Sequence, residues 1–218
     1  MTVGKAKIRA TFWDCGGVLL TNGWDEHARK RVVEHFGLNF DEFERRHYNA
    51  NDLWERGKID AQEYLRETVF YTPRAFSEGE FFSKMRDITQ VLYPATIEFL
   101  GALRARGSRD NSTYMLSNES RELMEYRIPT FGLDGLFDAY LVSAYIGLRK
   151  PEAAFFQCAL DISQRRPEEC VFIDDREENL EGARKLGIHG IRMTSPEQVI
   201  AELRRLGVTA DGATERYT

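Results

Sequence analysis

Four short apolar runs, each followed directly by polar residues, limit the fold of this chain more than any other feature. The runs are residues 10–13, 113–116, 139–142 and 171–173. Runs of this length and composition are typical of strands that are buried on both faces of a parallel sheet. Helical patterns of apolar residues lie between and after them, one closing at Gly107 and another at Gly187. This alternation predicts an α/β fold with a Rossmann-like parallel sheet and helices on both faces.

Two further patterns extend this prediction toward the C-terminus. The pattern of residues 187–193 predicts a fifth strand, with a weaker signal because glycines interrupt it. Ser195 and Pro196 then open a last helix, with the hydroxyl residue as the cap and proline at the first helical position. The remaining residues, 208–218, are polar, and we expect a flexible tail there.

The segment of residues 22–93 breaks the alternation, because it carries only helical signals. Asp60 and Ser77 each stand three residues before a glutamate, which is the spacing of a capping box. A sheet core cannot absorb about 70 residues of helix, so we expect an inserted helical-bundle cap over the strand ends. The predicted organisation is an α/β core of residues 1–21 and 94–207 and a helical cap of residues 22–93.

Charge and composition exclude several classes of function. Thirty basic and 35 acidic residues leave a net charge of −5, so we expect no nucleic-acid partner and no membrane partner. No apolar run approaches the roughly 18 residues of a spanning helix, and the first residues lack the apolar centre of a signal peptide. Three cysteines without paired spacing suit a reducing compartment. We expect a cytoplasmic monomer or homodimer without disulfides.

Polar residues follow the predicted strands at the edge where parallel sheets bind ligands. In an open α/β sheet, ligands bind beyond the carboxyl ends of the strands, which brings distant residues together. The residues that this rule gathers are Asp14, Ser117, Asn118, Asp174 and Asp175, with Lys150 from the loop after the third strand. Carboxylates, one ammonium and small polar donors suit a divalent cation that holds a phosphate.

These segments resemble the four motifs of the haloacid dehalogenase-like (HAD) hydrolase superfamily. The motifs are Asp-Cys-Gly-Gly-Val-Leu at 14–19, Leu-Ser-Asn at 116–118, Arg-Lys-Pro at 149–151 and Ile-Asp-Asp at 173–175, in that order. The resemblance covers the chain from Ile8 to about Leu206. A helical cap between the first two motifs is similar to the subgroup that contains small sugar-phosphate phosphatases and the dehalogenases themselves.

The resemblance implies a phosphatase that uses Mg²⁺ and acts on a small phosphorylated metabolite. Asp14 would be the nucleophile that forms an aspartyl-phosphate, which splits one difficult hydrolysis into two displacements. Asp14, the backbone carbonyl of Gly16 and Asp175 would bind the cation. Asp174 would act through a water or orient a ligand.

The other two motifs would hold the phosphoryl group. Ser117 and Asn118 offer a hydroxyl and amide or backbone N–H donors to its oxygens. The ammonium of Lys150, held at a loop end before Pro151, would offset the charge of Asp14 and of the phosphate. Asn179 matches a further polar position of the fourth motif, although an exposed place on a helix is about as frequent for such a residue.

Gly16 is the main departure from the family pattern. Most phosphatases of the superfamily carry a second Asp there, which protonates the leaving oxygen and later activates water. Its absence favours slow turnover or an ester with a good leaving group. It also leaves open a protein that binds a phosphorylated ligand without turning it over. A 2-haloacid dehalogenase is a further alternative, although such enzymes favour a tyrosine at this position and lack the paired acids.

Each residue also has a structural interpretation that needs no ligand. Asp14 could begin a turn before two glycines, and Asp174 and Asp175 could cap the next helix. Cys170 and Arg176 have the C-x₅-R spacing of cysteine-dependent phosphatases, but the intervening residues contain no glycine and two carboxylates. The aromatic residues Trp24, Tyr48 and Trp54 are candidates for a cleft between cap and core, or for the core of the cap.

Overall fold

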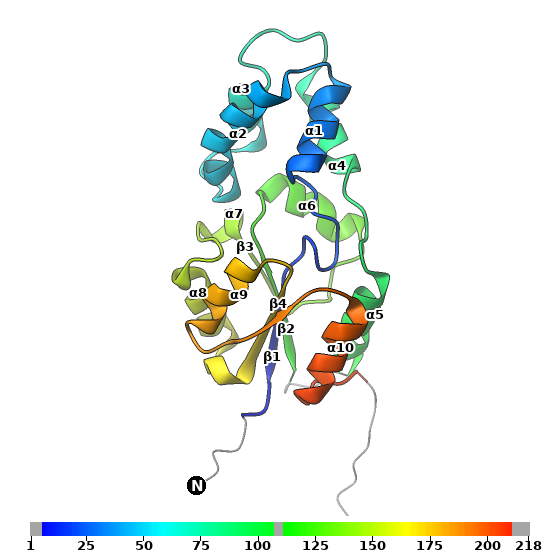
Figure 1. Cartoon of the computed structure of the whole chain (residues 1–218), viewed down its shortest axis with the longest axis vertical. Coiled ribbons are helices and arrows are strands. Elements are labelled where there is room, and N and C mark those ends of the chain that lie inside the picture. The colour runs from blue at the N-terminus through cyan, green and yellow to red at the C-terminus, as the bar shows by residue number, and fades with distance from the viewer. Residues whose placement is uncertain (1–5, 107–110, 211–218) are drawn as a thin grey trace, which may run out of the picture.

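The structure, a computed structural model, describes residues 6–106 and 111–210. A parallel sheet with the strand order β3-β2-β1-β4-β5 lies at its centre (Figure 1). The strands are β1 (Ala10–Trp13), β2 (Ser112–Ser117), β3 (Ala139–Val142), β4 (Cys170–Asp174) and β5 (His189–Arg192). All four strand pairings are parallel, and the weak fifth strand is present. The predicted α/β class is confirmed. Strand β1 lies at the centre of the sheet, between β2 and β4.

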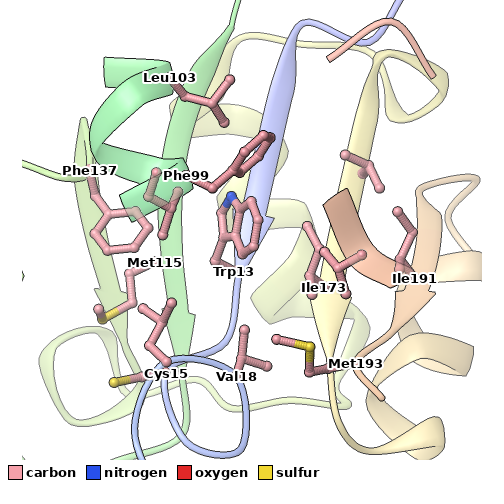
Figure 2. Close-up of a cluster of buried hydrophobic side chains, with 14 of the residues drawn as sticks. Trp13, Cys15, Val18, Phe99, Leu103, Met115, Phe137, Ile173, Ile191 and Met193 are labelled. Atoms are coloured by element: carbon pink, nitrogen blue, oxygen red, sulfur yellow. The ribbon is translucent and has the colours of Figure 1, made fainter. Parts of the chain in front are cut away.

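Helices cover both faces of the sheet, because successive side chains of each strand point to opposite sides. Helices α5 (Pro94–Ala105) and α10 (Pro196–Arg205) cover one face, and α8 (Ala153–Ser163) and α9 (Glu177–Arg184) the other (Figure 1). Trp13 of β1 lies in the middle of the first face, beside Phe99 of α5 (Figure 2). Phe12, the preceding residue, packs in the cluster on the opposite face.

Shorter elements complete the core. Helix α6 (Arg121–Thr130) follows β2, α7 (Ser143–Ile146) follows β3, and the 3₁₀ helix η1 (Pro167–Glu169) precedes β4. Met124 of α6 belongs to the cluster on the sheet, whereas its neighbour Leu123 belongs to a separate cluster formed by the inserted helices. Helix α6 therefore lies between the sheet and the insertion.

Four helices inserted after β1 stand over the carboxyl ends of the strands (Figure 1). They are α1 (Glu26–His35), α2 (Phe40–Glu55), α3 (Ala61–Thr68) and α4 (Glu78–Asp87). Their apolar faces form their own cluster, with Trp54, Tyr64 and Phe81 fully enclosed in it. Asp60 caps α3, and Ser77 forms the complete capping box of α4, as their spacing predicts. We refer to α1–α4 as the helical bundle.

The two segments that join the helical bundle to the core run side by side. Leu20 and Val91 form an antiparallel bridge. The N–H of Thr21 donates to the carbonyl of Gln90 at 2.8 Å, and the N–H of Leu92 donates to the carbonyl of Leu19 at 2.9 Å. The chain therefore leaves and re-enters the core at one point.

The end of the described chain differs from the expectation in one respect. Ser195 caps α10 through the N–H of Gln198, as predicted. Val208, however, is fully buried in the cluster against the sheet, so a flexible tail cannot begin there. Most of the expected tail, residues 211–218, lies outside the described residues. Among the described residues, no helix combines the length and apolar character needed to span a membrane.

Candidate active site

Three carboxylates meet where β1 and β4 end. Asp14 directly follows β1, Asp174 is the last residue of β4, and Asp175 comes next. One carboxylate oxygen from each lies within 4.8 Å of the other two. Because β1 and β4 are neighbours in the sheet, the order of the strands produces this meeting of residues 160 positions apart in sequence.

Lys150 supplies a positive charge to this cluster from the loop after β3. Its side chain is 1 % exposed, and its Nζ lies 2.9 Å from Asp14 Oδ1 and 2.7 Å from Asp174 Oδ2. Burial lowers the pKa of Lys150, but Asp14 and Asp174 more than offset this and the pKa is raised. The ammonium is therefore held in its charged form between two carboxylates.

Asp14 is enclosed and lies among like charges. Burial raises the pKa of Asp14 to about 8, although Lys150 acts in the opposite direction, and the nearby Asp174 and Asp175 add to the effect of burial. Asp14 Oδ1 accepts a hydrogen bond from the N–H of the next residue, Cys15, at 2.7 Å and forms an ion pair with Lys150. Asp14 therefore favours its protonated form near neutral pH without a cation, and a bound cation would favour the ionised carboxylate that a nucleophile requires.

The two acids of the fourth motif have different surroundings. Asp174 is fully buried, and its oxygens accept hydrogen bonds from Lys150, from the side chain of Asn179 at 3.0 Å and from the N–H of Arg176 at 2.8 Å. Asp175 Oδ2 accepts from Asn22 Nδ2 at 3.2 Å, whereas its Oδ1 is buried with no hydrogen-bond partner in the described structure. An unpartnered buried carboxylate oxygen is the atom expected of a cation ligand.

The residues after β2 are placed beside this cluster. Ser117 is buried at the end of the strand and lines the same cavity as Asp14. The side chain of Asn118 is joined to the backbone of Lys150: Nδ2 donates to its carbonyl and Oδ1 accepts from its N–H, each at 2.8 Å. The amide of Asn118 thus fixes the loop that delivers the ammonium. Its backbone N–H and the second hydrogen of Nδ2 are the donors that it could offer a ligand.

A cavity of about 350 Å³ lies between these residues and the helical bundle. The core contributes Asp14, Gly16, Ser117 and Lys150 to its walls, and the helical bundle contributes Asn51 and Glu55. Five of the seven predicted site residues line this cavity, and Asp174 and Asp175 do not.

The side of the cavity formed by the helical bundle contains residues that sequence reasoning missed. Arg149, the first residue of the third motif, pairs through Nη2 with Glu55 Oε2 of α2 at 2.7 Å and through Nη1 with Asp52 at 2.8 Å. Burial raises the pKa of Glu55, which also accepts from Asn51 at 3.1 Å. No periodicity marks these residues, because they meet only when α2 is placed over the loop before Lys150.

Two of the three candidate aromatic residues lie at the cavity. Trp24 and Trp54 line it, and both also pack in the cluster of the helical bundle. Tyr48 is 85 % exposed and does not line it. The indole of Trp54 donates to Glu122 of α6 at 3.1 Å, so this side chain also joins the helical bundle to the core.

The competing cysteine site is not supported. Burial raises the pKa of Cys170 to about 12, and the residue lies at the start of β4, at the opposite end of the strand from the cavity. Burial also raises the pKa of Cys15, beside Asp14, to about 12. Neither thiol is therefore in the nucleophilic thiolate form near neutral pH.

The comparisons with known proteins agree with this geometry. The family model described as haloacid dehalogenase-like hydrolase matches residues 8–187. The chain belongs to this family. It is a hydrolase, and the four segments that resemble HAD motifs all fall within the matched residues.

Relatives of this HAD hydrolase include proteins named for phosphatase activity. It is 27 % identical to a sesquiterpene phosphatase of Aspergillus oryzae, over 91 % of this chain and 96 % of that protein. It is 30 % identical to acyl-CoA dehydrogenase family member 10 of Mus musculus, over 93 % of this chain but 19 % of that protein.

Solved structures share the fold of this HAD hydrolase. One is a HAD family enzyme of Bacteroides thetaiotaomicron in complex with magnesium and inorganic phosphate, with a TM-score of 0.67 and 22 % identity. The match covers 85 % of this chain and 93 % of that one. At this level of identity the likeness establishes the fold, and the chemistry has to be argued from the residues of this chain.

Proposed function

We propose that this HAD hydrolase is a Mg²⁺-dependent phosphatase that hydrolyses a small phosphorylated metabolite through an aspartyl-phosphate on Asp14. The observation that carries the proposal is the cluster of Asp14, Asp174 and Asp175 closed on one side by the buried ammonium of Lys150. We also propose that residues 1–21 and 94–207 form the catalytic core and residues 22–93 a cap that selects the substrate.

The donor set fits a magnesium ion. We assign Asp14, Asp175 and the backbone carbonyl of Gly16 as its ligands, because hard oxygen donors suit this ion and Asp175 Oδ1 lacks any other partner in the described structure. The ion would supply positive charge that lets an anionic nucleophile approach an anionic phosphate. The magnesium in the Bacteroides enzyme supports the choice of cation for this chain.

Asp174 has a different assigned role. Its oxygens are engaged by Lys150, Asn179 and the N–H of Arg176, so it positions the ammonium instead of binding the cation directly. Lys150 holds one oxygen of Asp14 and would neutralise charge on the phosphoryl group. Ser117 Oγ and the N–H of Asn118 are the assigned donors to the phosphoryl oxygens.

The reaction would proceed in two balanced steps. In the first, an Asp14 carboxylate oxygen forms a bond to phosphorus as the ester P–O bond breaks, and the leaving oxygen takes a proton from water and leaves hydroxide, which the proton released in the second step neutralises. In the second, water attacks phosphorus and the bond to Asp14 breaks, which releases inorganic phosphate, a proton and the free carboxylate. Gly16 contributes no acid or base to either step, so the substrate should carry a good leaving group.

The walls of the cavity favour a polar substrate. Arg29 and Arg149 line it together with Glu55 and Asn51, so the groups that face the leaving part of the ester can donate and accept hydrogen bonds. A small sugar phosphate with its phosphate at the anomeric oxygen combines such hydroxyl groups with a good leaving group. An apolar terpenyl phosphate, as acted on by the Aspergillus relative according to its name, fits these walls less well.

A metal-dependent substrate screen tests the proposal. The purified protein is assayed on a panel of phosphate monoesters with Mg²⁺ and with EDTA, beside the Asp14→Asn variant. We expect hydrolysis that requires Mg²⁺ and falls at least 100-fold in Asp14→Asn. Asp25→Asn is the matched control, since Asp25 also lines the cavity but caps α1.

Three results would contradict the proposal: activity that is indifferent to metal, activity that survives in Asp14→Asn, or no hydrolysis of any ester. Release of chloride from chloroacetate would identify a dehalogenase instead. Tight binding of a phosphorylated compound without turnover would identify a binding protein.

A further inference from the structure

The side chain of Asn22 occupies space at the nucleophile that a side chain on residue 16 would need. A Cβ atom added to Gly16 would lie 2.7 Å from Asn22 Oδ1, closer than such atoms approach in proteins. Asn22 stands on the first segment joining the core to the helical bundle, two residues after the bridge between Leu20 and Val91. Gly16 and Asn22 both line the cavity with Asp14.

The same amide holds one oxygen of Asp175. Nδ2 of Asn22 donates to Asp175 Oδ2 at 3.2 Å, and Asp175 Oδ1 is left without a hydrogen-bond partner in the described structure. A hydrogen bond to one oxygen fixes the plane of the carboxylate and thereby the direction of the other oxygen. Asn22 therefore connects two features, the unsubstituted position 16 and the orientation of Asp175.

We propose that Asn22 is a positioning residue of the catalytic centre, whose amide takes the place of a residue-16 side chain and fixes Asp175. This inference rests on the proposed function for its kinetic consequences, but not for its consequences for cation binding. The glycine at position 16 and the asparagine at position 22 form a matched pair. Either one changed alone should be worse than both changed together.

The pair has a chemical consequence for the leaving group. An amide can accept a hydrogen bond through Oδ1 but has no proton to transfer near neutral pH. When the P–O bond breaks, the leaving oxygen must take its proton from water, so the rate should depend steeply on the acidity of the alcohol released. A correctly placed general acid contributes typically 10²- to 10⁴-fold and makes this dependence shallow.

The experiment compares Asn22→Ala, Gly16→Asp and the double variant Gly16→Asp/Asn22→Ala with the unchanged protein. Thr21→Ala is the matched control, because it removes the hydrogen bond from the N–H of Gln90 to Thr21 Oγ1, 3.0 Å, in the same segment without touching Asp175. Mg²⁺ affinity is measured by titration calorimetry without substrate. Hydrolysis is measured on aryl and alkyl phosphates whose leaving groups span a wide range of acidity.

We expect Asn22→Ala to weaken Mg²⁺ binding about 10-fold, the lower end of the range for residues that orient metal ligands, and Thr21→Ala to leave it unchanged. Gly16→Asp alone should lose at least 10-fold in activity, because the new side chain would push the Asn22 amide away from Asp175. The double variant should hydrolyse esters of weakly acidic alcohols at least 10-fold faster than Asn22→Ala, with a shallower dependence on the leaving group.

Two results would overturn the inference: unchanged Mg²⁺ affinity in Asn22→Ala, or a gain of 10-fold or more in Gly16→Asp while Asn22 is retained. If both variants with Asp at position 16 fail to fold, the Mg²⁺ affinity of Asn22→Ala decides. If the unchanged protein hydrolyses no ester but Asn22→Ala still weakens Mg²⁺ binding, the proposed function fails and the positioning role stands.

Discussion

The ammonium of Lys150 lies 2.9 Å from Asp14 Oδ1, and its side chain is almost completely enclosed. Replacing it with methionine should therefore leave Asp14 and Asp174 buried without their counter-charge. Loss of one partner from a buried ion pair costs about 3–5 kcal/mol, so we expect Lys150→Met to lower the free energy of unfolding by that amount at pH 8 without Mg²⁺. Urea denaturation measures it.

Arg149→Met is the control for the Lys150 substitution. Arg149 is the neighbouring residue, and its side chain is 26 % exposed where it pairs with Asp52 and Glu55. Its loss should cost about 1 kcal/mol. Equal urea midpoints for Lys150→Met and the unchanged protein would show that the enclosed ammonium does not stabilise the site.

His47 should make the helical bundle less stable in acid. Trp24 Nε1 donates to the hydroxyl of Tyr64 at 2.9 Å, and that hydroxyl lies 2.7 Å from His47 Nδ1. A neutral ring can accept a hydrogen bond from this hydroxyl at Nδ1, whereas a protonated ring could only donate there. Burial lowers the pKa of His47 from 6.5 to about 4, so the unfolded chain takes up a proton first as the pH falls.

The sign of this effect follows from proton linkage. The stabilisation from neutral His47 is complete above pH 6.5 and is lost as the pH falls toward 4, by at most about 3 kcal/mol. The free energy of unfolding should be measured by urea denaturation from pH 4 to 7. The slope attributable to His47 should disappear in His47→Gln and persist in His189→Gln, an exposed control. Equal slopes in all three proteins would contradict the prediction.

Glu122 of α6 should join the helical bundle to the core. Its Oε1 accepts from the N–H of Ala61, the first residue of α3, at 2.9 Å, and its Oε2 accepts from Trp54 Nε1 at 3.1 Å. Glu122→Ala leaves both donors without this partner, and an unpaired buried donor costs about 1–3 kcal/mol. Urea denaturation and hydrogen exchange of α2 and α3 should show the loss.

Glu125→Ala on the same helix is the matched control, because its carboxylate is 58 % exposed and pairs at the surface with Arg121. It should change stability by less than about 0.5 kcal/mol. If Glu122→Ala and Glu125→Ala behave alike, the two hydrogen bonds of Glu122 do not hold the bundle.

Gly23 occupies a crowded point between the joining segments. An added Cβ would lie 2.0 Å from Arg127 Nη2 and 2.5 Å from Thr89 Oγ1, and Arg127 is itself buried beside Glu119. We expect Gly23→Ala to lower the free energy of unfolding by about 1–3 kcal/mol, the usual range for overpacking. Gly101→Ala, in the interior of α5 with room for a methyl group, should instead stabilise by about 0.5–1 kcal/mol. Thermal denaturation of both variants measures these changes. If Gly23→Ala is as stable as the unchanged protein, the close packing around Gly23 is contradicted.

The sheet could be predicted from sequence because its strands are buried on both faces. Complete burial makes β1 and β4 continuous apolar runs, and their ends are marked by Asp14 and by Asp174 and Asp175. The rule that ligands bind at the carboxyl ends of strands then locates the cluster without any knowledge of distance. The helix caps at Asp60 and Ser77 could also be predicted, because capping depends on residues only three positions apart.

Contacts between the helical bundle and the core could not be predicted in this way. Arg149 meets Glu55, and Asn22 meets Asp175, only after α2 and the first joining segment have been placed over the sheet. Asn and Gly are frequent in turns, and nothing in the sequence around Asn22 and Gly23 indicates which residues lie opposite them. The different surroundings of Asp174 and Asp175 could not be predicted either. The two residues are adjacent in sequence, but their hydrogen-bond partners come from different parts of the chain.

The antiparallel bridge between Leu20 and Val91 has a consequence for how such a chain can diversify. Because both ends of the inserted segment leave the sheet at neighbouring positions, a short turn could close the same gap, and the core would not need to be rerouted. Lengthening the segment adds little closure entropy, about 0.6 kcal/mol for each doubling. Lids of very different size could therefore be exchanged above an unchanged reaction centre, as modules with a common attachment point.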